Sequence, residues 1–317
     1  MIETRLLRNA VMLDKHRNFA RAARALNITQ PTLSRNIQLL EEKIGERLFD
    51  RLPKTILPTQ AGEIMLKHAR FIISSSRNMQ EEIRRHQGLL EGSIRIGAGP
   101  YPANAVLAPA VGHFSKRYPG IDIEISVDDW RKLPYRLIKE DLDFILAETS
   151  QLDTSRDYEV IRLNRHAGFF FCRHNHPLLK KSNLTPGDLS LFPLIFTTFP
   201  RRLSHAINSF LSSGRDESAP TKKLQSIICN SLATMKTTIS NSESIGIGTY
   251  GTLATELEAG LFVALPFRIP ELRTDYDIVK RKALSLTPAA SDLIDLLLEF
   301  DEEQSRLEID LIKSLDQ

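Results

Sequence analysis

The sequence is poor in cysteine and has no long apolar run. Among its 317 residues are two cysteines, Cys172 and Cys229, far apart and without a CxxC spacing. This argues against a disulfide framework or a zinc site, favours two small buried apolar side chains, and fits a reducing cytoplasm. No stretch approaches the roughly 18 consecutive apolar residues that a membrane span needs. Charges of both signs interrupt the apolar residues of the N-terminus, so we do not expect a signal peptide or a membrane partner.

Signatures of common enzyme classes are also missing. The sequence has no P-loop, no GxSxG and no HExxH. The run GIGTYG at 246–251 is a literal GxGxxG, but it follows a polar run and lacks an acidic residue at the expected spacing of about 20 residues. We interpret it as a turn and a close-packing site. His174 and His176 have no evident third metal ligand, so we expect a solvent-facing turn there, no metal and no other cofactor.

What the sequence does have is the composition of a folded, soluble protein with an uneven charge. Hydrophobic residues make up 42% and charged residues 26%, and the length suggests two or three domains. Residues 1–91 contain 16 Lys and Arg against 10 Asp and Glu, a net charge of +6, whereas the remainder has 26 against 29, a net charge of −3. A basic segment on a mildly acidic body favours a polyanion-binding head, although many soluble domains are equally basic.

Apolar faces at helical spacing predict three short helices within residues 1–58. Steps of three and four residues define the faces, alanines in the second permit close packing, and Gly45 follows the third as a C-terminal stop. The piece PKTILP, bracketed by prolines, is predicted to be extended. The three faces consist of Leu6, Ala10 and Leu13, then Phe19, Ala23 and Leu26, then Leu33, Ile37, Leu40 and Ile44.

A long helix is predicted from Thr59 to about His86. An apolar stripe with steps of four and three residues is typical of a helix that pairs with another helix. An ordinary core helix is the alternative, but a length of roughly 40 Å and a position between two differently composed regions favour a linker and dimerisation helix. The stripe consists of Ala61, Met65, His68, Ile72, Ser75, Met79 and Ile83.

From Gly92 onward, strand and helix patterns alternate, which predicts mostly parallel α/β sheets. One α/β unit interrupts another, with crossings near 162–166 and 266–270, so we predict two lobes with a ligand site between them at the carboxyl ends of strands. The predicted domains are 1–58, the linker helix 59–91, and 92–317. Within the last, lobe I comprises 92–162 and 267–317, and lobe II comprises 163–266.

The run ALNITQPTLSRNIQLLE, residues 25–41, joins two of the short helices through the turn 27–29. This is a helix-turn-helix arrangement, in which Thr29 or Gln30 caps the third helix and Pro31 costs it no hydrogen bond. Gln pairs with adenine, Arg with guanine, and Ser or Thr with phosphate. A solvated polar face is the alternative. The polar side chains that lie outward or to the side are Gln30, Thr32, Ser34, Arg35 and Gln38.

The N-terminal part closely resembles the DNA-binding domain of LysR-type transcriptional regulators. The family pattern AA..L..SQP.LS..I..LE..LG..LF.R matches FARAARALNITQPTLSRNIQLLEEKIGERLFDR, and LPTQAG follows. The match covers nearly all of residues 1–70 without a gap. It departs from the family at Thr29 and at 57–59. Weaker matches, such as LDFILAE and SIGIGTYG, extend the resemblance over about the whole chain.

The resemblance implies a winged helix-turn-helix, a dimerising linker helix, and a two-lobed α/β effector domain like a periplasmic binding protein. The implied partners are double-stranded DNA with an interrupted palindrome, a small-molecule effector, and further copies of the chain in a dimer of dimers. RNA polymerase is another candidate partner. Residues implied at the DNA are Gln30, Pro31, Thr32, Ser34 and Arg35, with Arg51 and Lys54 in the wing. For Arg51 the alternative is a salt bridge with Asp50 or Glu46.

In this family the effector lies between the lobes, against the loop after the first effector-domain strand. That loop is Gly99-Pro100-Tyr101-Pro102 here, whereas the family often has Ser or Thr. We hypothesise a small organic acid contacted by Tyr101, Thr149 and Thr198, with Arg201 or Arg202 as countercharge. Arginines that point to solvent are the alternative. The full candidate set adds Glu148, Thr197, Phe199 and Gly248.

Two other classes stay open from the sequence. One is a cytoplasmic solute-binding protein with a helical appendage, which the helix-turn-helix run and the basic first third disfavour. The other is an enzyme of periplasmic-binding-protein fold, which would need a catalytic constellation that the sequence does not offer. We therefore predict a cytoplasmic, non-enzymatic transcriptional regulator.

Overall fold

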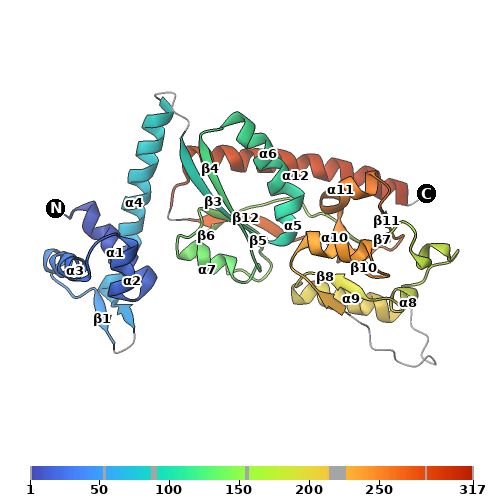
Figure 1. The fold of residues 1–317 in the computed structure, drawn as a ribbon, viewed down its shortest axis with the longest axis horizontal. Coiled ribbons are helices and arrows are strands. Elements are labelled where there is room, and N and C mark those ends of the chain that lie inside the picture. Colours follow the sequence, from blue (N-terminus) through green and yellow to red (C-terminus); the bar gives the residue numbers. More distant parts are fainter. Residues whose placement is uncertain are drawn as a thin grey trace. The chain divides into compact units, whose positions relative to one another are not determined.

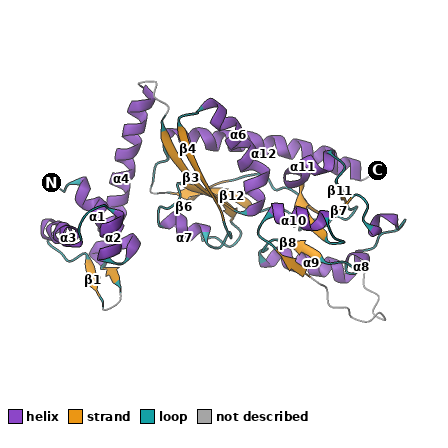
Figure 2. Cartoon of the chain, in the orientation of Figure 1, coloured by secondary structure: helices purple, strands orange, loops and turns teal. Residues whose placement is uncertain are grey.

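The computed structural model of the chain describes residues 2–52, 55–86, 91–153, 157–213, 226–282 and 284–315 (Figure 1). The chain divides into two compact units. One comprises residues 1–92 and 281–289, and the other residues 93–280 and 290–317. The second unit contains both α/β sheets, whose strands are enclosed between helices in Figure 2.

The first unit begins with three short helices around one apolar core. These are α1 (Thr4–His16), α2 (Phe19–Ala25) and α3 (Gln30–Ile44). The apolar faces predicted from the spacing of residues in α1 and α3 are the faces that become buried, because burial of aliphatic side chains is the main force that holds short helices together. The fully buried side chains include Leu6, Leu13, Leu33, Ile37 and Leu40.

Side chains and one glycine fix where these helices begin and end. Asn18 caps α2 by accepting a hydrogen bond from the Arg21 amide, and Thr29 caps α3 by accepting one from the Thr32 amide at 3.3 Å. Of the two predicted caps for α3, the structure uses Thr29. Gly45 ends α3 with a φ of 85°, a left-handed conformation that favours glycine.

A short hairpin and a long helix complete the N-terminal unit. The antiparallel strands β1 (Phe49–Arg51) and β2 (Ile56–Pro58) form the wing. α4 (Gln60–His86) follows, and the Thr59 hydroxyl caps it by accepting from the Gly62 amide at 3.0 Å. A Cβ on Gly62 would lie 2.0 Å from the Leu48 carbonyl oxygen, so only glycine fits there.

α4 has one apolar side buried and another exposed. Leu66 and Ala69 pack into the helical core. Asn78 donates hydrogen bonds to the carbonyls of Ser285 and Leu286, which attaches the segment 281–289 to this unit. Five large apolar side chains of α4 are exposed: Ile64, Phe71, Ile72, Met79 and Ile83.

Lobe I of the second unit is built on a five-stranded sheet in the order β4-β3-β5-β12-β6. Its helices start directly after the first strand, where the sequence predicted a loop: the residues from Pro100 onward are already helical, through a π-helical turn. The elements are β3 (Gly92–Ala98), α5 (Pro100–Pro102), η1 (Ala103–Leu107), α6 (Ala108–Arg117), β4 (Ile121–Val127), α7 (Leu133–Ile138), β5 (Phe144–Glu148), β6 (Tyr158–Ile161), β12 (Tyr276–Arg281) and α12 (Pro288–Leu315).

Lobe II has a second five-stranded sheet, in the order β11-β7-β10-β8-β9. Two aromatic-rich cores line its faces, one around Phe170 and one around Phe171, which are neighbours in β7 and point to opposite sides. The elements are β7 (Gly168–Arg173), η2 (Pro177–Lys180), α8 (Pro186–Leu189), β8 (Leu194–Phe196), α9 (Arg201–Ser213), β9 (Ser226–Ile228), α10 (Leu232–Ser240), β10 (Ile245–Thr249), α11 (Tyr250–Glu258) and β11 (Phe262–Ala264).

The sheets contain the predicted parallel pairs, and each also contains a strand that runs against a neighbour. β3 and β5 pair in parallel, as do β8 with β9 and β10, but β12 runs antiparallel to β5, and β7 runs antiparallel to β10 and β11. The chain crosses between the lobes, so β7 and β12 begin at the lobe boundary, where β5 and β10 end. The crossings therefore reverse β7 in lobe II, whose other four strands run the same way, and β12 relative to β3 and β5 in lobe I.

The two crossing segments are tied to each other and to α12. The Gly168 amide donates to the Leu272 carbonyl at 2.6 Å, and the Thr274 amide donates to the His166 carbonyl. The His166 ring lies between Asp301 and Glu308 of α12, at 2.8 and 2.9 Å. α12 thus packs on its own chain as far as Glu308.

Candidate functional site

The first candidate site is the outer face of α3. Its core-facing residues alternate with polar ones at helical spacing, so a single helix presents a row of hydrogen-bonding groups opposite its apolar face. Ser34 is half-buried, and the other predicted contact residues on α3 are exposed: Gln30, Pro31, Thr32, Arg35 and Gln38.

The N-terminal end of α3 suits an anion. Thr29 satisfies one backbone amide, while Pro31 in the first turn has no amide to satisfy. The remaining N–H groups and the positive end of the helix dipole favour negative charge in front of this turn. Phosphate oxygens of a nucleic acid are ligands of this kind.

The wing adds a second basic position. Glu41 accepts hydrogen bonds from the amides of Leu48 and Phe49, at 2.8 and 3.3 Å, and so fixes the entry to β1. The Arg51 guanidinium lies over the Phe19 ring, 5.0 Å from its centroid. Within the described residues it has no ion pair with Asp50 or Glu46, the predicted alternative. Lys54, also predicted at the DNA, lies outside the described residues.

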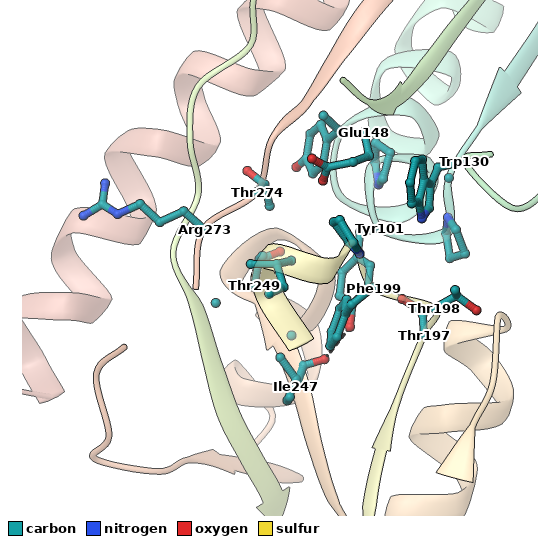
Figure 3. A pocket seen from close by; sticks show the side chains of 18 of the residues that line it. Tyr101, Trp130, Glu148, Thr197, Thr198, Phe199, Ile247, Thr249, Arg273 and Thr274 are labelled. Carbon is teal, nitrogen blue, oxygen red and sulfur yellow. Dashed lines mark hydrogen bonds between the residues drawn. The ribbon is translucent and has the colours of Figure 1, made fainter. Parts of the chain in front are cut away.

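The second candidate site is a cavity between the lobes, with about 720 Å³ of empty space that includes its opening to solvent (Figure 3). The ends of β3, β4, β5, β8 and β10 meet there, as expected for a ligand site in an α/β fold. We call it the interlobe cavity. Its wall is formed by Gly99, Pro100, Tyr101, Pro102, Asp129, Trp130, Glu148, Gly168, Thr197, Thr198, Phe199, Pro200, Leu203, Asn230, Ile247, Gly248, Thr249, Leu272, Arg273, Thr274 and Tyr276.

Tyr101 connects the two lobes across this cavity. Its hydroxyl donates to the Ile247 carbonyl of lobe II at 2.7 Å, and its ring stacks on Phe199, with centroids 6.1 Å apart. Burial raises the pKa of the Tyr101 hydroxyl far above its usual value, which a hydrogen bond with Thr197 only partly opposes. The hydroxyl therefore stays protonated and acts as a donor.

Both carboxylates on the cavity wall are already paired with arginines. Arg202 of α9 contacts both carboxylate oxygens of Glu148 at 3.4 Å and donates to the Arg273 carbonyl at 3.1 Å. Burial raises the pKa of Glu148, and Arg202 counteracts that increase. Asp129 accepts from Arg131 Nε at 2.9 Å, and those bonds lower the pKa of Asp129. Figure 3 shows the Arg273 guanidinium turned away from the other labelled side chains.

Nine of the twelve predicted effector residues line the interlobe cavity, and three do not. Thr149 is buried and donates to Asp277 at 2.6 Å. It follows Glu148 directly at the end of a strand, so the two side chains point to opposite sides. Arg201 is exposed at the start of α9, and Arg202 pairs with Glu148 outside the cavity wall.

The sequence reasoning missed several residues of this wall. Trp130 lies three residues after the end of β4, so the rule that ligands bind at the carboxyl ends of strands would have found it. Leu272, Thr274 and Tyr276 belong to the second crossing segment, whose place at the cavity depends on long-range folding. No local signal marks them.

Two other sequence interpretations change. His176 is buried, not in a solvent-facing turn, because it accepts from the Leu178 amide and contacts the Glu243 carbonyl at 3.1 Å. GIGTYG is the end of β10 and the start of α11, and the predicted close packing is confirmed: a Cβ on Gly246 would lie 2.5 Å from Phe171. The described residues contain no group of three potential metal ligands. None of their helices combines the length and hydropathy needed to cross a membrane.

Two family models match the chain. The model for the bacterial regulatory helix-turn-helix protein of the lysR family covers residues 4–63, and the model for the LysR substrate binding domain covers residues 87–302. The chain belongs to the LysR family of transcriptional regulators. It is therefore a DNA-binding regulator with an effector-binding domain, and the predicted family and fold class are confirmed.

Relatives support this family assignment over the whole chain. The SDS degradation transcriptional activation protein of a Pseudomonas strain is 33% identical over 305 residues, which cover 95% of this chain and 97% of that protein. Two solved structures share the fold, each with a TM-score of 0.65. A full-length OxyR variant from Pseudomonas aeruginosa is 18% identical, with 95% of each chain covered. LysG of Corynebacterium glutamicum, solved with bound effector arginine, is 19% identical, with 95% of this chain and 98% of that chain covered.

Proposed function

We propose that this LysR-type regulator responds to an organic acid with an apolar body, and that this effector binds in the interlobe cavity. The observation that supports the proposal most directly is the composition of the wall, where aromatic rings, prolines and aliphatic side chains surround a few hydroxyl and amide groups. Apolar walls with a small number of polar groups are typical of small-molecule sites. The one cation among the wall residues, Arg273, has its guanidinium turned away from the other labelled side chains in Figure 3, which disfavours a compact, highly charged metabolite.

The choice of an acid over a neutral molecule is supported by the donors on the wall. Hydroxyls of Thr197, Thr198, Thr249 and Thr274 line the cavity. The relative that is 33% identical over 95% of the chain is named for activating SDS degradation. An alkyl sulfate has the same design, one anionic head on an apolar chain. Short alkyl sulfates are therefore the first ligands to test on this protein.

Effector binding would act on the contacts that join the lobes. Tyr101 bonds across the cavity to Ile247, and Arg202 of lobe II pairs with Glu148 of lobe I beside it. A ligand that inserts between the lobes changes the geometry of both contacts. An effector shifts a conformational equilibrium only by its difference in affinity for the two states, so these contacts are where that difference arises.

At the DNA, we infer that the outer face of α3 enters the major groove of an interrupted palindrome. Gln30 and Arg35 are exposed near the start of α3, where side chains of a recognition helix reach base edges. Thr32 and Ser34 would take phosphates, Pro31 and Gln38 would lie against the groove, and Arg51 and Lys54 of the wing would contact the backbone or the minor groove.

The exposed apolar side of α4 supports a dimer. Ile64, Phe71, Ile72, Met79 and Ile83 recur at the spacing of a helix seam and leave apolar area in water that a second copy would bury. We further infer a dimer of dimers on DNA, contact with RNA polymerase, and a cytoplasmic location. These three inferences rest on the role of a LysR-type protein as a transcriptional regulator.

Footprinting tests this proposal. The DNA upstream of the regulator's own gene is probed at two salt concentrations, with and without octyl sulfate, using wild type and Arg35→Ala. We expect a salt-sensitive footprint that the variant loses and that the ligand alters. Salt-sensitive binding whose footprint no anionic amphiphile changes would refute the effector assignment. No binding of any duplex at low salt would refute the operator assignment.

A further inference from the structure

Two residues of the cavity wall, Tyr276 and Trp130, each carry a buried polar atom that lacks a hydrogen-bond partner within the described part of the chain, and that of Trp130 can only donate. Trp130 is the only tryptophan of the chain, and it lines the cavity beside Asp129. Its indole Nε1 is buried and has no hydrogen-bond partner among the described residues. An indole N–H is only a donor, so a buried one is satisfied by an acceptor that arrives from the cavity.

The position of Trp130 is fixed by its neighbours. The Asp128 amide donates to the Ala98 carbonyl at 3.1 Å, which fixes the end of β4 against β3. The Lys132 amide donates to the Asp129 carbonyl at 2.9 Å and closes a turn around Trp130. Trp130 also packs against the lobe I core cluster to which Leu133 and Leu137 belong. The indole is therefore held in place before any ligand binds.

The charges nearby decide what kind of acceptor fits. The neighbouring carboxylate of Asp129 is neutralised by Arg131, and Glu148 is contacted by Arg202. The Arg273 guanidinium is turned away from the labelled wall residues in Figure 3. A head group near Trp130 would thus meet a neutral donor and neutralised ion pairs. It would accept hydrogen bonds without needing an arginine.

We propose that Trp130 determines effector specificity by donating its indole N–H to an oxygen of the effector's anionic head group. The inference rests on the proposed apolar organic acid in the interlobe cavity and adds how that acid is recognised. The ligand class is a monoanionic amphiphile, such as an alkyl sulfate or a fatty acid, whose head binds neutral donors and whose chain lies against Tyr101 and Phe199. A compact dianion would lack the countercharges it requires.

The single tryptophan makes the first measurement specific to this site. Octyl sulfate, octanoate, octanol and octylamine are titrated below their aggregation concentrations, while Trp130 fluorescence is recorded on the full chain. We expect saturable changes with the two anions at lower concentrations than with octanol or octylamine. Tighter binding of octylamine would overturn the proposal, because the aromatic wall would then recognise a cation.

Calorimetry on Trp130→Phe then separates the N–H from the ring. The phenyl ring keeps most of the apolar contact and removes the donor. We expect octyl sulfate affinity to fall roughly tenfold, as for loss of a hydrogen bond to a charged group, with octanol affinity unchanged within about twofold. Tyr135→Phe, which removes a polar atom from an exposed ring of α7 outside the cavity wall, is the matched control and should change neither.

The outcomes distinguish this inference from the proposed function. If wild type binds none of the anions, the proposed effector class fails. If wild type binds octyl sulfate and Trp130→Phe weakens octyl sulfate and octanol equally, or weakens neither, the effector class stands and the role of the indole N–H is wrong. Circular dichroism of Trp130→Phe verifies that the variant is folded.

Discussion

The outer face of α3 and the interlobe cavity are assembled in opposite ways. All predicted contacts of α3 come from one helix of 15 residues, whose inward and outward positions follow from its period. The cavity wall collects residues from Gly99 to Tyr276, at the ends of strands in two lobes. The residues of the first site lie in one short stretch of sequence, whereas those of the second come together only when distant parts of the chain fold.

This difference predicts how mutations behave. On α3, core side chains and contact side chains alternate, so stability and DNA binding are expected to be separable by choice of position. In the cavity, the residues that face a ligand also join the lobes, as Tyr101 and Glu148 do. Stability and ligand response are therefore expected to change together there.

The largest effect is expected from the buried face of α3. Leu33 is fully buried in the helical core, and Leu33→Ala leaves a cavity that neighbouring helices fill only in part. We expect the N-terminal unit to lose about 2–5 kcal/mol of stability. Urea unfolding followed by circular dichroism measures it. A loss of DNA binding with unchanged unfolding would contradict a purely structural role for Leu33.

The next effect concerns the contact of His166, in the first crossing segment, with Asp301 and Glu308 of α12. Burial disfavours a charged His166, but hydrogen bonds with Asp301 and Glu308 outweigh it and raise the pKa of His166 to about 9, from 6.5. A raised folded-state pKa stabilises the protein fully below the unfolded-state pKa, and the stabilisation disappears as pH rises through 9. We expect a loss on the order of 3 kcal/mol between pH 6.5 and values above 9.

The measurement is the free energy of unfolding of the effector unit against pH. His166→Gln should remove the decline in that window and lower stability at neutral pH. His205→Gln, which changes an exposed histidine on α9, is the matched control and should keep the decline. A decline that persists in His166→Gln would assign it to other groups.

Arg35 tests the exposed face of the same helix that Leu33 stabilises. The residue is exposed on α3, so Arg35→Ala should leave unfolding unchanged within about 0.5 kcal/mol. Loss of one base contact should weaken specific DNA binding by about 1–3 kcal/mol. Fluorescence anisotropy with operator and scrambled duplexes measures both affinities. Lys116→Ala, an exposed cation of α6, should alter neither. Equal weakening on both duplexes would instead identify Arg35 as a phosphate contact.

The same contrast explains what could be predicted from the sequence. Helix faces and caps of the N-terminal unit depend on near neighbours, and Leu33, Ile37 and Thr29 lie where local spacing put them. Strand ends also follow from local pattern, which is why Tyr101, Glu148 and Thr198 were found. The pairing of Arg202 with Glu148 could not be predicted, because the two residues are 54 positions apart and belong to different lobes. Local pattern also missed α11, since GIGTYG was interpreted as a turn although its Tyr250 begins a helix.

The smallest loss of stability is expected from a change at Tyr101. This change tests most directly whether stability and ligand response are coupled in the interlobe cavity. Tyr101→Phe removes the hydrogen bond to the Ile247 carbonyl across the cavity but keeps the ring on Phe199. We expect the effector unit to lose about 0.5–1.5 kcal/mol of stability, as for an ordinary hydrogen bond. Tyr158→Phe removes a comparable bond, to the Pro134 carbonyl within lobe I at 3.3 Å, and should cost a similar amount.

The two variants should differ in ligand response alone. Because the Tyr101 bond joins the lobes and the Tyr158 bond does not, only Tyr101→Phe should alter the affinity for octyl sulfate and its effect on the footprint. Calorimetry and footprinting on the pair, at matched stability, measure the difference. If both variants respond to the ligand as wild type does, the lobes are coupled elsewhere, and the ion pair between Glu148 and Arg202 becomes the contact to test, because it also joins the two lobes.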